Sequence, residues 1–148
     1  MIIKSITLNN YRLYKGENTL SLSSSDEKNI VLISGENGFG KTTFLHSLIW
    51  CLYGKLMIEV EVEIRKDINS NGYNSFLRSN MNNDVISEFE RVINDEMRQS
   101  IKKKGYTPEI EHLRTLTTYS VTIEFSEVVI PSLPCTSIKI SRSYDIIQ

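Results

Sequence analysis

The sequence predicts an α/β fold in which a mixed sheet, part of it antiparallel, is combined with a helix that follows a glycine-rich loop. Three observations lead to this fold class. A short apolar run, Ile30–Ile33, is mostly β-branched and unbroken, which is typical of a buried parallel strand. A glycine-rich segment and then an amphipathic helical pattern follow it. Both ends of the chain alternate apolar and polar residues, as antiparallel strands do.

Length and composition are those of one soluble domain, so we expect residues 1–148 to form a single domain. Of the 148 residues, 40% are hydrophobic, which is enough for a core. The formal net charge of −1 gives no overall attraction to nucleic acid, so contact with DNA requires a local patch or a partner. Lys4, Ser5 and Thr7 interrupt the first apolar residues, so neither a signal peptide nor a membrane span is predicted, and a cytoplasmic location is expected.

The glycine-rich segment matches the phosphate-loop pattern G-x-x-x-x-G-K-[ST] at every fixed position. Glycines at 35, 38 and 40 let the backbone turn with positive φ and approach an anion closely. Lys41 would reach the β- and γ-phosphates of a nucleotide, and the Thr42 hydroxyl would bind Mg²⁺. A glycine-rich turn that binds nothing is the alternative, but the strand before the loop and the helix after it favour a phosphate site.

The predicted helix after Lys41 has one apolar face and a glycine cap. Gly54 stands where a C-terminal cap is expected. The residues of that face recur at three- and four-residue spacing: Phe44, Leu45, Leu48, Ile49 and Leu52.

The first residues predict an antiparallel pair of strands beside the strand at 30–33. Ile2–Leu8 alternates imperfectly, Asn9 and Asn10 are expected to end it, and Thr19–Leu22 alternates again. Residues 23–28 are expected to form a polar surface loop.

The middle of the chain predicts one strand and then helices. Apolar residues at 58, 60, 62 and 64 alternate with Glu59, Glu61 and Glu63, which indicates a strand with an acidic face; a solvated face is favoured over a metal site. Residues 69–72 are expected to form a loop. A helix is predicted from its N-cap Asp84 through residues 102–104, a lysine run that caps the helix dipole rather than contacting a phosphate backbone.

Gly105 would close that helix, and Pro108 would start a short helix that carries His112. His46 and His112 have no partner at ligand spacing and are interpreted as ordinary polar or packing residues. Cys51 and Cys135 are far apart and are interpreted as reduced packing residues.

The end of the chain predicts a β-hairpin. Tyr119–Phe125 and Ile138–Ser141 alternate, and the prolines at 131 and 134 lie in their connection.

This order of parts resembles the N-terminal lobe of the SMC/RecF/SbcC class of ABC-type ATPases. Three segments carry the resemblance: the opening Ile3–Arg12 with its Asn-Tyr-Arg turn, the G-x-N-G-x-G-K-T-T form of the loop, and the Leu-Tyr-Gly-Lys sequence at 52–55. Within this class the DndD-like ATPases of bacterial DNA modification and defence are most similar, mainly through that last sequence.

The resemblance implies an ATP-binding lobe that uses ATP and Mg²⁺, with a variable insertion at about residues 56–115. It also implies that Asn37 holds the loop or approaches the γ-phosphate, that Arg12 lies near the nucleotide, and that Arg142 occupies an arginine-bearing strand; a solvated surface charge for Arg12 and a structural salt bridge for Arg142 remain the alternatives. The nucleotide-binding residues expected are Gly35, Asn37, Gly38, Phe39, Gly40, Lys41, Thr42, Thr43 and Arg12, with Thr42 as the Mg²⁺ ligand.

Two motifs of such ATPases are missing from the sequence. No run of four apolar residues precedes an aspartate, as a Walker B strand requires, and no Leu-Ser-Gly-Gly-like signature occurs. We therefore expect half of an ATPase head, completed by a C-terminal lobe and by a second head from the same or a related subunit, with DNA bound by the whole assembly. A non-catalytic nucleotide-sensing module remains open, and a small phosphotransferase is disfavoured because no arginine cluster follows the first helix.

Overall fold

The computed structural model describes residues 1–22, 25, 27–28, 30–102 and 115–147. Four strands, four α-helices and one 3₁₀ helix occur in the described part of the chain. In chain order they are β1 (Ile2–Tyr11), β2 (Tyr14–Ser21), α1 (Lys41–Tyr53), η1 (Gly54–Glu59), α2 (Val62–Asn71), α3 (Tyr73–Ser79), α4 (Asn83–Lys102), β3 (Thr118–Ser126) and β4 (Ser137–Asp145).

The strands form one antiparallel sheet in the order β2-β1-β3-β4. Both predicted hairpins are confirmed, although β1 continues through Asn9 and Asn10 to Tyr11 instead of ending there, and β2 begins at Tyr14 instead of Thr19. The neighbour predicted for β1 is wrong, because β1 pairs with β3 and places Ile6 opposite Ile123. The two ends of the sequence therefore meet at the centre of the sheet.

Alternation gives the sheet one apolar and one polar face. Ile6 and Leu8 of β1 and Val121 and Ile123 of β3 are buried together on the apolar face. On the polar face the hydroxyl groups of Thr7 and Thr19 lie 2.9 Å apart, and those of Thr122 and Ser141 lie 2.8 Å apart. Only the apolar face can bury a helix without leaving polar groups unpaired.

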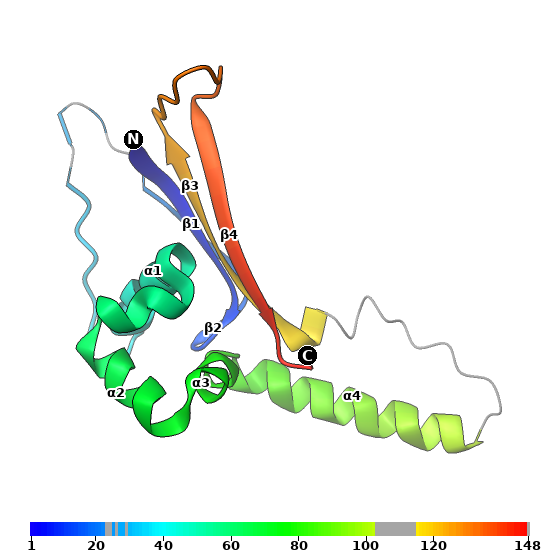
Figure 1. Cartoon of the computed structure of the whole chain (residues 1–148). Coiled ribbons are helices and arrows are strands. Elements are labelled where there is room, and N and C mark those ends of the chain that lie inside the picture. Colours follow the sequence, from blue (N-terminus) through cyan, green and yellow to red (C-terminus); the bar gives the residue numbers. More distant parts are fainter. Residues whose placement is uncertain (23–24, 26, 29, 103–114, 148) are drawn as a thin grey trace.

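Helix α1 packs on this apolar face, and Figure 1 shows α2 and α3 on the same side of the sheet while α4 extends away from it. The ring of Trp50 packs against two tyrosines that also contact each other, with its centroid 6.0 Å from Tyr11 of β1 and 5.2 Å from Tyr119 of β3. The predicted apolar face of this helix is partly wrong. Leu45 and Leu52 are exposed, whereas the buried residues are Phe44, Ser47, Trp50 and Cys51.

The end of α1 is fixed by two residues far apart in the sequence. The backbone N–H of Gly54 donates to the Trp50 carbonyl, which confirms the predicted C-cap. Arg142 of β4 donates from Nε to the Cys51 carbonyl at 3.1 Å, and its guanidinium lies 6.0 Å from the Trp50 ring centroid. Arg142 thus binds a helix terminus, where a cation is favoured, and no described ion pair includes it.

The strand predicted at Ile30–Ile33 is not formed. These residues are extended coil with exposed side chains; Ile30 and Leu32 are 85% and 86% exposed. A strand is defined by its ladder partners, and no described residue pairs with this run. The parallel part of the predicted mixed sheet is therefore absent from the described residues.

The strand predicted at residues 58–64 is wrong, because this segment is helical in η1 and α2. Glu61 caps α2 by accepting from the Glu63 N–H, and Arg65 Nε donates to the Ile58 carbonyl at 2.6 Å. Spacing by two at 60, 62 and 64 also contains the four-residue spacing of a helix, which continues through Ile68. Residues 69–71, predicted as a loop, belong to α2, and Gly72 caps that helix.

The predicted long helix is present as α4, but its cap lies two residues before the predicted one. Asn82 accepts from the backbone N–H groups of Asp84 and Val85 at 3.1 and 3.2 Å. The predicted lysine cap at 103–104, Gly105 and the short helix with His112 lie outside the described residues.

The two cysteines are free, as predicted, and Cys51 is fully buried in the core. Among the described residues, no helix combines the length and apolarity needed to cross a bilayer.

The Gly54–Arg142 contact gives a stability prediction. A Cβ on Gly54 would lie 2.6 Å from Arg142 Nη1, whereas one on Gly72 would meet nothing within 4 Å; both glycines cap helices with positive φ. Gly54→Ala should lower the free energy of unfolding in urea by about 1–2 kcal/mol more than Gly72→Ala, because it also displaces the arginine cap. In an Arg142→Ala background the two alanine variants should become equal, and a persisting difference would contradict this explanation.

Candidate functional site

The loop between the extended run and α1 forms a tight turn at its glycines. Gly38 and Gly40 have φ values of 89° and 93°, which favour glycine, whereas the positive φ predicted for Gly35 is wrong. The carbonyl of Gly40 accepts from the Phe44 N–H at 2.8 Å, so the first helical bond starts inside the loop. The first backbone N–H groups of α1 have no carbonyl partner within the helix, which makes this end suited to an anion.

Lys41 folds back over the loop that precedes it. Its Nζ donates to the carbonyl of Gly35 and, at 2.9 Å, to the carbonyl of Glu36. These bonds hold the ammonium group against the backbone at the start of the loop. If an anion bound there, Lys41 could donate to it instead of to the two neutral carbonyls. A charged acceptor forms the stronger hydrogen bond.

A hollow of about 180 Å³ is lined by Lys41 and its neighbours in the loop. Six of the nine residues that the sequence predicts for nucleotide binding line it, together with Leu13 and Glu36. The six are Asn37, Gly38, Gly40, Lys41, Thr42 and Thr43. Gly35, Phe39 and Arg12 are not part of its lining.

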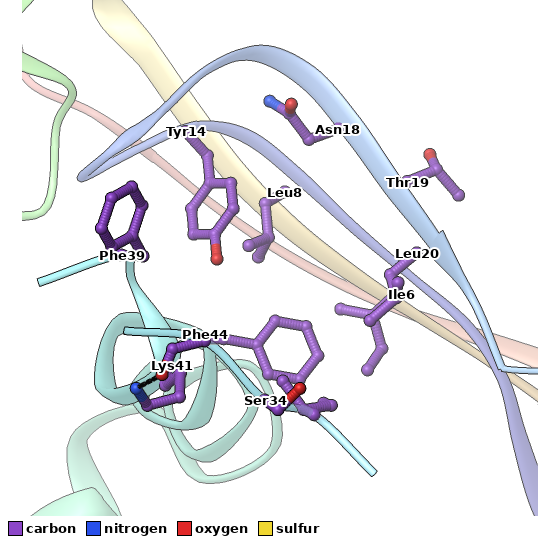
Figure 2. A pocket seen from close by; sticks show the side chains of 12 residues that line it. Ile6, Leu8, Tyr14, Asn18, Thr19, Leu20, Ser34, Phe39, Lys41 and Phe44 are labelled. Atoms are coloured by element: carbon purple, nitrogen blue, oxygen red, sulfur yellow. Dashed lines mark hydrogen bonds between the residues drawn. The ribbon is translucent and has the colours of Figure 1, made fainter. Parts of the chain in front are cut away.

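A second cavity, of about 360 Å³, lies between the loop and the β1–β2 hairpin (Figure 2). Gly35, Phe39 and Lys41 border it on the loop side. Its apolar wall comes from the sheet and from α1: Ile6, Leu8, Leu20 and Phe44. The sequence pattern does not indicate this cavity, because the cavity depends on how the hairpin packs against the loop.

Tyr14 connects that hairpin to the phosphate loop. Its hydroxyl lies 3.4 Å from the Gly40 carbonyl oxygen, to which it donates, and a Cβ on Gly40 would be only 3.0 Å from the same hydroxyl. Gly40 is therefore required both by its positive φ and by this close approach. Tyr14 was missed at the sequence level, since an alternating hairpin does not show which residue faces the loop.

Arg12 lines neither cavity and is held by the segment between α3 and α4. Its Nε donates to Asn80 Oδ1 at 2.7 Å, and its backbone N–H donates to the Asn80 carbonyl at 2.7 Å. The guanidinium also lies 5.9 Å from the Phe76 ring centroid. The alternative of a solvated surface charge does not describe this partly buried, bonded side chain.

His46 lies one helical turn after Thr42 on α1. Burial lowers the pKa of its imidazole below the usual range, the Arg12 guanidinium lowers it further, and Glu61 raises it. His46 is therefore neutral near pH 7.

The three glutamates at 59, 61 and 63 do not form the acidic strand face that the alternation predicts. Glu59, Glu61 and Glu63 lie at the end of η1 and the start of α2, not along one strand face. Within the described part of the chain, no group of three or more His, Cys, Asp or Glu side chains could hold a metal ion.

Comparison with known proteins identifies the family. A family model described as an AAA domain matches residues 5–143, which is most of the chain. No curated protein and no solved structure matches the chain. The family match supports an SMC-type ATPase lobe. The chain therefore belongs to the AAA domain family.

Proposed function

We propose that this chain is the ATP-binding lobe of an SMC-like ATPase, and that the hollow beside Lys41 is its phosphate site. The observation that carries the proposal is the convergence of Lys41, Thr42 and the loop backbone on one small hollow. Membership of the AAA domain family supports ATP and Mg²⁺ as the ligands.

Each residue of the loop would have its own role in binding ATP. Gly35, Gly38 and Gly40 would let the backbone approach the phosphates, Lys41 would give up its carbonyl partners for them, and Asn37 would hold the loop or approach the γ-phosphate. The exposed hydroxyl of Thr42 would be a ligand of Mg²⁺, which neutralises phosphate charge when bound. The remaining candidates are Phe39, Thr43 and Arg12.

A second lobe would complete the site. The extended run before the loop exposes four consecutive apolar side chains and unpaired backbone groups, and an adjoining strand would bury both. The sequence also lacks the acidic residues that orient water in phosphoryl transfer. We therefore propose that the lobe alone binds ATP with little turnover, and that a C-terminal lobe and a second head supply the rest.

The biological setting follows from the resemblance to DndD-like and other SMC/RecF/SbcC proteins. We propose a cytoplasmic assembly that acts on DNA in repair, modification or anti-phage defence. The second candidate is a non-catalytic nucleotide sensor, which the missing acidic partner favours. DNA-stimulated ATP hydrolysis by the completed assembly would support the first, and ATP binding that no added lobe or DNA converts into hydrolysis would support the second.

Lys41→Ala tests the shared premise of ATP binding. Loss of a charge-assisted hydrogen bond, worth about 1.5–3 kcal/mol, should weaken ATP binding at least about tenfold in calorimetry with Mg²⁺. Lys139→Ala, an exposed position on β4, is the control and should bind as the unchanged chain does. Equal affinities of the Lys41→Ala variant and the unchanged chain would exclude the phosphate-site assignment.

The Thr42 hydroxyl can be tested separately. The unchanged chain should bind ATP more tightly with Mg²⁺ than with EDTA, and Thr42→Ala should remove most of this difference because the metal loses its protein ligand. Thr42→Ser retains the hydroxyl and should restore the difference. A full Mg²⁺ effect in the alanine variant would remove Thr42 from the metal site.

The exposed apolar run gives a test of completion by a second lobe. Ile30→Lys and Leu32→Lys should each change the stability of this chain by less than about 0.5 kcal/mol, because both side chains are already exposed. The same changes should abolish the ATPase activity gained when the coding sequence after Gln148, or a separately encoded lobe, is included. Val129→Lys, at a 92% exposed apolar position in the β3–β4 connection, is the matched control and should preserve that activity.

A further inference from the structure

We propose that Asn80 and Asn82 are positioning residues for the phosphate site, which hold the Asn10–Arg12 turn against the loop and link it to the start of α4. The proposal rests on the proposed function. It assigns a role at the nucleotide site to a segment of the insertion that the family resemblance marks only as variable.

Four hydrogen bonds join the two segments. Arg12 donates twice to Asn80, from its backbone N–H and from Nε, each at 2.7 Å. Asn82 donates from its backbone N–H to the Asn10 carbonyl at 2.9 Å and from Nδ2 to the Arg12 carbonyl at 2.6 Å. Asn80, Met81 and Asn82 are all buried, so these bonds are shielded from water.

The joined turn has a conformation that it would not keep unaided. Asn10 and Arg12 have φ values of 52° and 48°, in the left-handed region that a long side chain such as arginine disfavours. A residue keeps this left-handed backbone conformation where surrounding contacts hold it. The contacts from Asn80 and Asn82, together with the Asn10 side chain, which accepts from the Gly16 N–H at 2.8 Å, supply that restraint.

The same turn reaches the phosphate loop through the two residues that follow it. Leu13 lines the hollow beside Lys41, and the Tyr14 hydroxyl donates to the Gly40 carbonyl. The position of the turn therefore sets one wall of the hollow and one contact of the loop. Loosening the turn would release both.

Asn82 also connects the turn to α4. Its Oδ1 caps the helix through the N–H groups of Asp84 and Val85, while its Nδ2 holds the Arg12 carbonyl. One side-chain amide thus joins the helix terminus and the turn. Because coupling between sites is reciprocal, nucleotide that tightens the loop should also protect the first turn of α4.

Asn82→Asp separates the two functions of this amide in the full chain. Aspartate caps a helix as well as asparagine does but has no N–H for the Arg12 carbonyl. We expect ATP affinity in calorimetry with Mg²⁺ to fall about three- to tenfold. Asn83→Asp adds the same charge at the exposed next residue and should keep the affinity within about twofold.

Amide hydrogen exchange tests whether Asn82 does more than cap α4. If it only capped the helix, ATP would not change the exchange rates at the start of α4. Adding ATP to the unchanged chain and to the Asn83→Asp variant should slow exchange of the Asp84 and Val85 amides, and this response should be lost in Asn82→Asp. Asn80→Ala, which removes the acceptor for Arg12 Nε, should give the same loss without touching the cap. Unfolding curves check that each variant is folded.

The outcomes distinguish this inference from the function on which it rests. No ATP binding by the unchanged chain would remove both. ATP binding with unaltered affinity in Asn82→Asp and Asn80→Ala, or with no exchange response at residues 84 and 85 of the unchanged chain, would overturn the positioning role and leave the phosphate site intact.

Discussion

The packing of α1 on the sheet is the interaction on which the rest of the structure depends. Trp50 is buried against both Tyr11 and Tyr119, so the helix contacts the two central strands, one from each end of the sequence. Aromatic pairs of this kind each contribute roughly 0.5–1.5 kcal/mol beyond the burial of their area. Arg142 then fixes the C-terminal end of the helix through the Cys51 carbonyl. With the helix held at both its middle and its end, the loop before Lys41 has a defined place relative to the sheet.

The proposed phosphate site depends on this arrangement because its walls come from separate parts of the chain. The loop supplies Lys41 and Thr42, and the β1–β2 hairpin supplies Leu13. Tyr14 closes the hairpin onto the loop, and the α3–α4 segment holds the turn that precedes Leu13. A change in the insertion can therefore alter a site from which it is distant in sequence. The exposed run at 30–33 and the missing acidic partner support the proposal that another lobe completes this site.

The local sequence pattern correctly predicted the elements that are stabilised by contacts within one helix or between two neighbouring strands. Both hairpins and the helix after Lys41 with its Gly54 cap are present, and α4 starts within two residues of its predicted start. The pattern gave wrong predictions where contacts with other segments decide whether a segment is a strand or a helix. Ile30–Ile33 has the composition of a buried strand but no strand to pair with among the described residues, and the alternation at 58–64 fits a helix as well as a strand.

The sequence by itself determined the phosphate-loop residues, because glycine, lysine and threonine at fixed spacing are required by the chemistry of phosphate binding and not by distant contacts. It also determined the family resemblance, which the match over residues 5–143 supports. Only the tertiary structure decided which residues surround that loop. The roles of four residues depend on hydrogen bonds to backbone groups between 26 and 91 residues away: Tyr14, Asn80, Asn82 and Arg142. A sequence pattern with a period of two or four residues cannot predict contacts over such separations.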